Sequence, residues 1–206
     1  MYDFEKRDTP EVSYLTLRKI VGILGVSLPI VVAVWGLTLY GTLLPSISDY
    51  YKGRTGDAFV GILFVAAWFL FTYKGYEPKD DIAGDLACLF GLGVALFPNS
   101  GTPWEARIHF LSAAGFFLVL SYFAMFLFTK SKSDPTPRKK LRNAIYRTCG
   151  VVMLSCIVLI GLFYLFFEES DFARFSPVFW LETFALWGFG ISWFIKGETL
   201  FQDQAG

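Results

Sequence analysis

Long apolar stretches separated by short polar connections are the main pattern along this chain. A hydrocarbon core of about 30 Å is crossed by roughly 20 apolar helical residues. Six stretches reach or approach that length, at residues 20–44, 57–73, 82–97, 104–129, 143–167 and 177–195. The pattern therefore predicts an all-α fold, a polytopic membrane bundle of six transmembrane helices that forms a single domain over residues 1–206.

The ends of these stretches and the connections between them refine that prediction. The first stretch is too long and begins too late for the apolar region of a signal peptide, and no A-x-A cleavage site follows it. The one long connection, Lys130–Arg142, is rich in charges and prolines and is predicted to be a solvated loop. The two three-helix halves share no motif, which disfavours an inverted-repeat transporter.

Composition agrees with a membrane setting. Of the 206 residues, 54% are hydrophobic and only 17% charged, whereas soluble domains carry about 25% charged residues. We therefore expect an integral membrane protein, in the plasma (inner) membrane of a prokaryote or an endomembrane of a eukaryote. A formal net charge of zero argues against nucleic acid as a partner. Three cysteines and one histidine exclude a disulfide scaffold and multi-histidine zinc sites, and we expect no metal and no cofactor.

The distribution of basic residues predicts the orientation of the bundle. Of 18 Lys and Arg residues, 14 fall in the N-terminal segment, the second connection, the fourth connection with its flanks, and the position after the last stretch. Cytoplasmic loops carry an excess of Lys and Arg. With an even number of spans, this bias predicts that both termini lie in the cytoplasm.

Polar residues that are costly inside a membrane converge on the opposite side. His109 lies five residues after Trp104 and Glu182 five after Pro177, so each is predicted roughly 8 Å below the outer boundary at 1.5 Å per residue. The first stretch ends on that side with P-S-I-S-D, which supplies Ser46, Ser48 and Asp49. We predict a shared outer-leaflet polar pocket formed by these five residues.

Four further residues are expected to bind a ligand at this pocket. They are Asp57, Arg107, Arg174 and Trp187. The two arginines could hold a phosphate or a carboxylate group. Trp187 falls at mid-depth and is interpreted as a cavity wall.

Simpler interpretations compete with a shared site. His109 and Glu182 could form only an interhelical hydrogen bond, worth about 0.6–2 kcal/mol. Ser46, Ser48 and Asp49 could form only a turn that closes the first span. A stripe of small residues in the third span, Gly84, Cys88, Gly91 and Ala95, indicates close helix packing and could also mediate a homo-oligomer.

The string L-L-P-S-I-S-D-Y at residues 43–50 resembles the P-x-I-S-D signature of the FRAG/DRAM/Sfk family. That family includes the damage-regulated autophagy modulators and the Golgi factor that remodels the lipid of GPI anchors. R-I-H-F-L-S-A around His109 and E-T-F-A-L-W-G-F-G-I-S-W from Glu182 follow in a similar order, so the resemblance covers roughly residues 20–200. It implies six helices, cytoplasmic termini and a lipid-related role on the luminal or external face.

Two classes of function stay open. In the first, the protein binds or remodels a membrane lipid, with His109 as general base, Glu182 or Asp49 orienting it, and Ser46 or Ser48 as nucleophile or hydrogen-bond donor. An enzyme of this kind would be a lipid acyl hydrolase or transferase, although G-x-S-x-G and H-E-x-x-H motifs are absent from the sequence. In the second, the protein is a non-catalytic transporter, channel or scaffold in which the same groups relay protons or cations.

Overall fold

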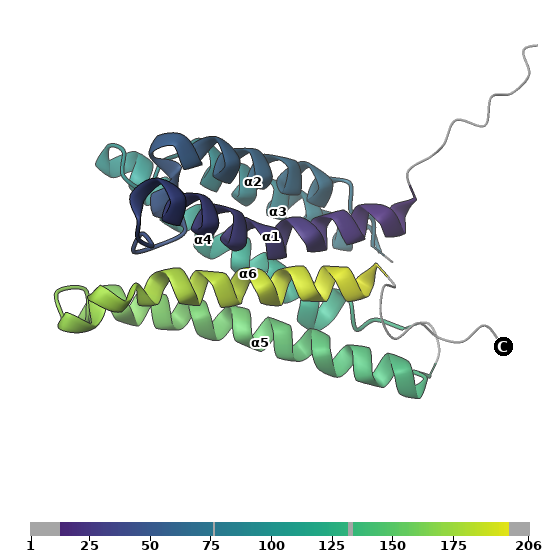
Figure 1. Ribbon diagram of the computed structural model, residues 1–206. Coiled ribbons are helices and arrows are strands. Elements are labelled where there is room, and N and C mark those ends of the chain that lie inside the picture. The colour runs from purple at the N-terminus through teal and green to yellow at the C-terminus, as the bar shows by residue number, and fades with distance from the viewer. Residues whose placement is uncertain (1–12, 76, 132–133, 198–206) are drawn as a thin grey trace, which may run out of the picture.

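The computed structural model describes residues 13–75, 77–131 and 134–197, and within them it is all-helical with no strand. Six helices run alternately up and down in one bundle (Figure 1). They are α1 (Tyr14–Tyr40), α2 (Gly56–Phe71), α3 (Pro78–Leu96), α4 (Pro103–Tyr122), α5 (Pro137–Phe166) and α6 (Pro177–Lys196). A π-helical turn, η3 (Phe123–Leu127), extends α4, and short 3-10 turns η1 (Ser48–Tyr51), η2 (Gly53–Thr55) and η4 (Asp171–Phe175) lie in the connections.

Local sequence signals set the helix boundaries. Proline is the first residue of α3, α4, α5 and α6, where its missing N–H has no intrahelical partner to lose. Thr102 and Glu105 form a reciprocal capping box at the start of α4. Gly41 adopts the left-handed conformation with φ 72° and ends α1 at Tyr40, four residues before the predicted end.

The predicted solvated loop over residues 130–142 was too long. Thr136 accepts a hydrogen bond from the Lys139 N–H, and α5 begins at Pro137 rather than at residue 143. The first turns of α5 are highly charged, so a stretch of apolar residues does not include them. The cap of Thr136 followed by Pro137 is itself a helix-start signal.

Five of the helical segments in the described part of the chain are long and apolar enough to cross a membrane, which suggests a membrane-embedded protein. The segment outside this set is α3, whose first eight residues include Lys79, Asp80, Asp81 and Asp85. It nevertheless has 19 residues and packs between α2 and α4. The count of six spans stays a prediction.

The two ends of the bundle have different chemistry. At one, which we call the basic end, Lys130 pairs with buried Asp80 at 2.6 Å, and the Tyr14 hydroxyl donates to the Lys74 carbonyl. The opposite, polar end contains residues 41–55, 97–102 and 167–176. Lys6, Arg7 and Lys132, which contributed to the predicted orientation, lie outside the described residues.

Helix α1 and helix α6 approach most closely through glycine. A Cβ on Gly22 would stand 2.8 Å from the Gly190 carbonyl oxygen, and one on Gly190 would stand 2.7 Å from the Gly22 carbonyl oxygen. Both clashes involve backbone, which cannot move aside as a side chain can. This contact sets how closely α1 and α6 approach each other.

The small-residue stripe of α3 packs within the chain. A Cβ on Gly84 would meet the Leu70 carbonyl of α2, and one on Gly91 would meet Ala67 of α2 and the Phe116 ring of α4. The small residues of α3 therefore allow close packing against α2 and α4, which was one of the two roles expected for the stripe. All four positions of the stripe are buried within the chain, and self-association through it stays a prediction.

Candidate functional site: a hydrogen-bonded Ser48, His109 and Glu182 beside a cavity

The P-S-I-S-D segment forms a tight turn against the start of α6. The Pro45 carbonyl accepts from the Phe179 N–H at 3.0 Å, which ties the segment to α6. The Ser46 N–H donates to Asp49 Oδ2 at 3.0 Å, and the Asp49 N–H donates to Ser46 Oγ at 3.1 Å. This reciprocal pair closes η1 in the manner of a capping box. Ser46 and Asp49 therefore form a turn that follows the first helix, as the simpler interpretation of this segment expected.

Tyr50 anchors the same segment through its hydroxyl and its backbone carbonyl. Its hydroxyl accepts from the Leu44 N–H at 3.1 Å, and its carbonyl accepts from the Thr55 hydroxyl at 2.9 Å. The ring is fully buried and occupies the space where Gly36 lacks a side chain. Burial raises the pKa of the Tyr50 hydroxyl above its usual value of 10, which keeps it protonated in the physiological range.

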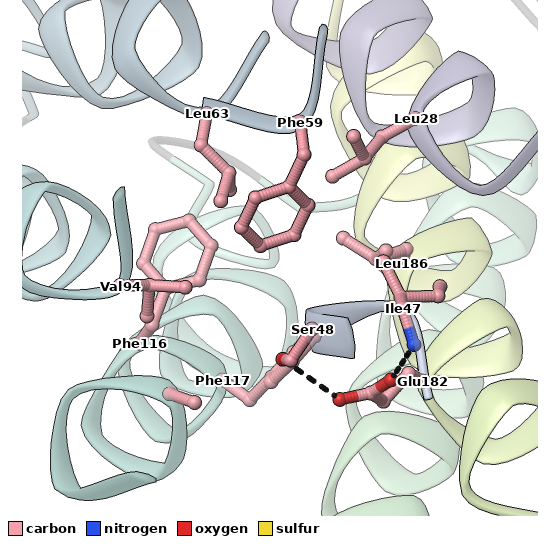
Figure 2. A pocket seen from close by; sticks show the side chains of 11 residues that line it. Leu28, Ile47, Ser48, Phe59, Leu63, Val94, Phe116, Phe117, Glu182 and Leu186 are labelled. Atoms are coloured by element: carbon pink, nitrogen blue, oxygen red, sulfur yellow. Dashed lines mark hydrogen bonds between the residues drawn. The ribbon is translucent and has the colours of Figure 1, made fainter. Parts of the chain in front are cut away.

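Ser48 is aimed away from the turn and into the bundle, where it meets two other predicted site residues. Its hydroxyl oxygen lies 2.9 Å from His109 Nε2 and 3.3 Å from Glu182 Oε1. The Ile47 N–H donates to the other carboxylate oxygen, Glu182 Oε2, at 2.5 Å. Figure 2 shows Ser48 and Ile47 directed at the Glu182 carboxylate. Three groups separated by up to 134 residues in sequence thus form one hydrogen-bonded set.

Hydrogen-bond accounting restricts where the protons of this set lie. His109 Nδ1 is 2.7 Å from the Phe97 carbonyl oxygen, which can only accept, so Nδ1 carries a proton. Ser48 has one hydroxyl hydrogen but two neighbours. Both of its contacts are hydrogen bonds only if one further proton lies on Glu182 or on His109 Nε2. The two arrangements would interconvert by proton transfer across Ser48 Oγ, so the geometry suits one exchangeable proton shared by the three side chains.

Asp49 lies beside this set rather than in it. Its Oδ1 accepts from the Asn99 side-chain amide at 2.7 Å, and its Oδ2 accepts from the Ser46 N–H. These bonds tie the connection between α1 and α2 to that between α3 and α4. The predicted role of Asp49 in orienting His109 does not fit, because the Phe97 carbonyl occupies the His109 Nδ1 position. Ser46 likewise uses its hydroxyl in the turn, so Ser48 is the serine available for chemistry.

A cavity of about 540 Å³ lies between α4, α5, α6 and the P-S-I-S-D segment. Its walls are largely apolar, and its lining residues are Ser46, Ser48, Phe110, Ala113, Ala114, Phe117, Ile157, Ile160, Gly161, Tyr164, Glu168, Val178 and Glu182. A side chain at Gly161 would meet no atom within 4 Å, and Phe110 and Tyr164 are 47% and 40% exposed. The cavity is therefore open between α4 and α5. Its volume is typical of sites for small molecules.

A second, smaller cavity of about 40 Å³ lies in the centre of the bundle (Figure 2). It is lined by apolar residues of α1, α2, α3, α4 and α6 together with Ser48 and Glu182. Ala113 and Phe117 line both cavities, as do Ser48 and Glu182. The Ser48–Glu182 contact therefore borders both the larger cavity and a central space large enough for a water molecule.

The four predicted ligand-binding residues do not line this site. Asp57, Arg107 and Arg174 are exposed and absent from both cavity walls, and the Arg174 guanidinium lies 4.9 Å from the centre of the Phe175 ring. Trp187 faces a groove between α1 and α6 with Pro29 and Leu37. It is five residues after Glu182, a spacing of about 140° around a helix, which turns it to another face of α6.

Sequence reasoning missed Tyr164 and Glu168, which line the open cavity from the end of α5. It also missed the Phe97 carbonyl and Asn99, which fix His109 and Asp49. Glu168 and Tyr164 could have been predicted from the sequence. They are a carboxylate and a phenol near the end of a predicted span, at the same predicted membrane depth as the other polar groups. A backbone carbonyl leaves no signal in a sequence.

Comparison of the chain with protein-family models, with curated proteins and with solved structures gave no match. The resemblance to the FRAG/DRAM/Sfk family therefore stays a prediction.

Proposed function

We propose that this protein binds or remodels a membrane lipid in the open cavity between α4, α5 and α6. The observation that carries the proposal is an apolar cavity of about 540 Å³ that is open along α4 and α5 and ends at Ser48 and Glu182. A chain-bearing amphiphile matches such a site, because its tail suits the Phe110, Phe117 and Ile157 walls and its head group can reach the polar end.

The proposed orientation has six spans, both termini in the cytoplasm and the polar end toward the outer leaflet. The excess of Lys and Arg at the basic end supports it. A cysteine introduced at exposed Asp171, between α5 and α6, tests it. The native cysteines Cys88, Cys149 and Cys156 are buried, so the new thiol can be read alone. Labelling by an impermeant reagent from the cytoplasmic side would overturn the orientation.

Binding is better supported than acyl transfer in this conformation. Attack by Ser48 on an ester would need N–H donors for the developing oxyanion. The nearby Ile47 N–H already donates to the Glu182 carboxylate. The geometry therefore favours a head group held at Ser48 and Glu182 over a covalent intermediate on Ser48.

Lipid carry-over tests the proposal directly. The protein is purified in a mild detergent, and the bound lipid is identified by mass spectrometry. We expect a retained amphiphile near one per chain that is lost in Gly161→Leu, which fills the cavity, and reduced in His109→Ala and Glu182→Ala. Gly61→Leu is the matched control, because a side chain there also meets no atom within 4 Å but lies on α2, away from the cavity. Absence of lipid from the wild type, or full retention by Gly161→Leu, would overturn the proposal.

The shared proton supports one second candidate, a proton or cation relay. Glu182 and Ser48 line both the open cavity and the central space, so a proton passed across Ser48 would move along the bundle interior toward His109. Proton flux into proteoliposomes measures this activity. Flux that is absent from the wild type, or unchanged in Glu182→Gln, would remove the relay.

A further inference from the structure

The ionisable side chains that line the open cavity are acidic or neutral. Among the described residues, its lining contains two carboxyl groups, Glu182 and Glu168, and the hydroxyls of Ser46, Ser48 and Tyr164, but no lysine or arginine. The arginines expected to bind an anionic head group lie elsewhere. An anion in this cavity would meet two acidic residues without a compensating cation.

Glu182 has only neutral hydrogen-bond partners in the described part of the chain. They are the backbone N–H groups of Ile47 and Ser48 and the Ser48 hydroxyl. When Ser48 gives its single hydrogen to Glu182, its contact with His109 is a hydrogen bond only if His109 Nε2 carries a proton. A carboxylate inside a membrane segment is costly without an opposite charge. A ligand with a positive charge and N–H donors would supply both the opposite charge and an additional hydrogen-bond donor for Glu182.

From this complementarity we infer that the ligand is a single-chain amphiphile with a protonated amine as its head group. The inference rests on the proposed lipid-binding function. The ammonium group lies between Glu182 and Glu168, where it replaces the shared proton as the donor to the carboxylate. Tyr164 lies on the same wall, and its ring can contact the cation. The alkyl chain extends along the apolar walls of α4 and α5.

The test compares hexadecyl amphiphiles of one chain length with different head groups. Hexadecylamine, hexadecanol and hexadecanoate are titrated onto the full chain in a neutral detergent, and bound complexes are counted by native mass spectrometry. We expect hexadecylamine to bind tenfold to a hundredfold more tightly than hexadecanol, the range given by a charge-assisted hydrogen bond. Lysophosphatidylethanolamine is a further arm, and tighter binding of it than of hexadecylamine would assign the ammonium to a phospholipid head group.

Variants link the preference to the two carboxyl groups. Glu168→Gln and Glu182→Gln are each expected to weaken hexadecylamine binding about tenfold, a loss of one charge-assisted contact. Glu168 is exposed and lies just after α5, so its replacement reads binding even if Glu182→Gln folds poorly. Glu169→Gln is the matched control, because this neighbour is exposed and outside the cavity lining. Its affinity should equal that of the wild type.

The outcomes separate this inference from the proposed function. Equal or tighter binding of hexadecanol or hexadecanoate, with loss in Gly161→Leu, would overturn the amine head group and leave lipid binding intact. Tighter binding of hexadecanoate that depends on Arg107, one turn from Phe110 on α4, would assign an anionic ligand instead. Absence of binding of every amphiphile would overturn both.

Discussion

Removal of the Ser48 hydroxyl is the most direct perturbation of the hydrogen-bonded set. Ser48→Ala deletes the 2.9 Å contact to His109 and the 3.3 Å contact to Glu182. Glu182 lines the open cavity, so water can replace its lost partner. His109 is completely buried and lines neither cavity, so its Nε2 would be left unpaired. An unsatisfied buried group costs about 1–3 kcal/mol, and we expect that loss in the free energy of unfolding.

A double-mutant cycle isolates this term. His109→Leu removes the nitrogen that Ser48→Ala would leave unpaired. We therefore expect Ser48→Ala to lower the free energy of unfolding by less in the His109→Leu background than in the wild type, with a difference of at least about 1 kcal/mol. The Phe97 carbonyl loses its partner in both proteins that carry His109→Leu, the single and the double variant, so that cost cancels in the cycle. Reversible unfolding by sodium dodecyl sulfate in mixed micelles measures each corner of the cycle.

The control cycle uses Ser46→Ala, two residues earlier. The Ser46 hydroxyl accepts the Asp49 N–H and does not contact His109, so Ser46→Ala and His109→Leu should be additive. Additivity of Ser48→Ala with His109→Leu, within about 0.5 kcal/mol, would refute the hydrogen-bonded set and with it the shared proton.

Two further predictions concern the scaffold. Gly190→Ala should destabilise the bundle by about 1–3 kcal/mol, because its Cβ meets α1 backbone. Gly61→Ala, whose Cβ would stand in open space, should not destabilise it. Equal unfolding midpoints for Gly190→Ala and Gly61→Ala would contradict the close contact between α1 and α6. At the basic end, the hydrogen bond to Asp80 raises the pKa of Lys130 above 10.5. The stabilisation is therefore full at neutral pH and lost as the pH rises through the raised value. Asp80→Asn should lower stability at pH 8 and flatten the pH dependence of stability above pH 10.5, where the unfolded chain loses the Lys130 proton before the folded one does. Wild-type and variant stability curves that run parallel in that range would reject the pairing.

Helix positions were largely predictable from the sequence. The apolar stretches located all six helices, because segments of this length and hydropathy have few alternatives to a helix in a membrane. Prolines and caps could have corrected the start of α5, since Thr136 and Pro137 mark it. The common depth of His109 and Glu182 also followed from counting residues along two parallel helices.

The sequence alone determined a helical, membrane-compatible chain with polar groups at one level of it. Only the tertiary structure decided which of them meet: Ser48 rather than Ser46 contacts His109, Glu182 rather than Asp49 joins it, and Arg107 and Arg174 lie outside the cavity. The physical reason is that depth depends on position along a helix, whereas contact depends on rotation about its axis and on the packing of neighbouring helices. Backbone groups such as the Gly22 and Phe97 carbonyls set those rotations, and every residue has the same backbone carbonyl.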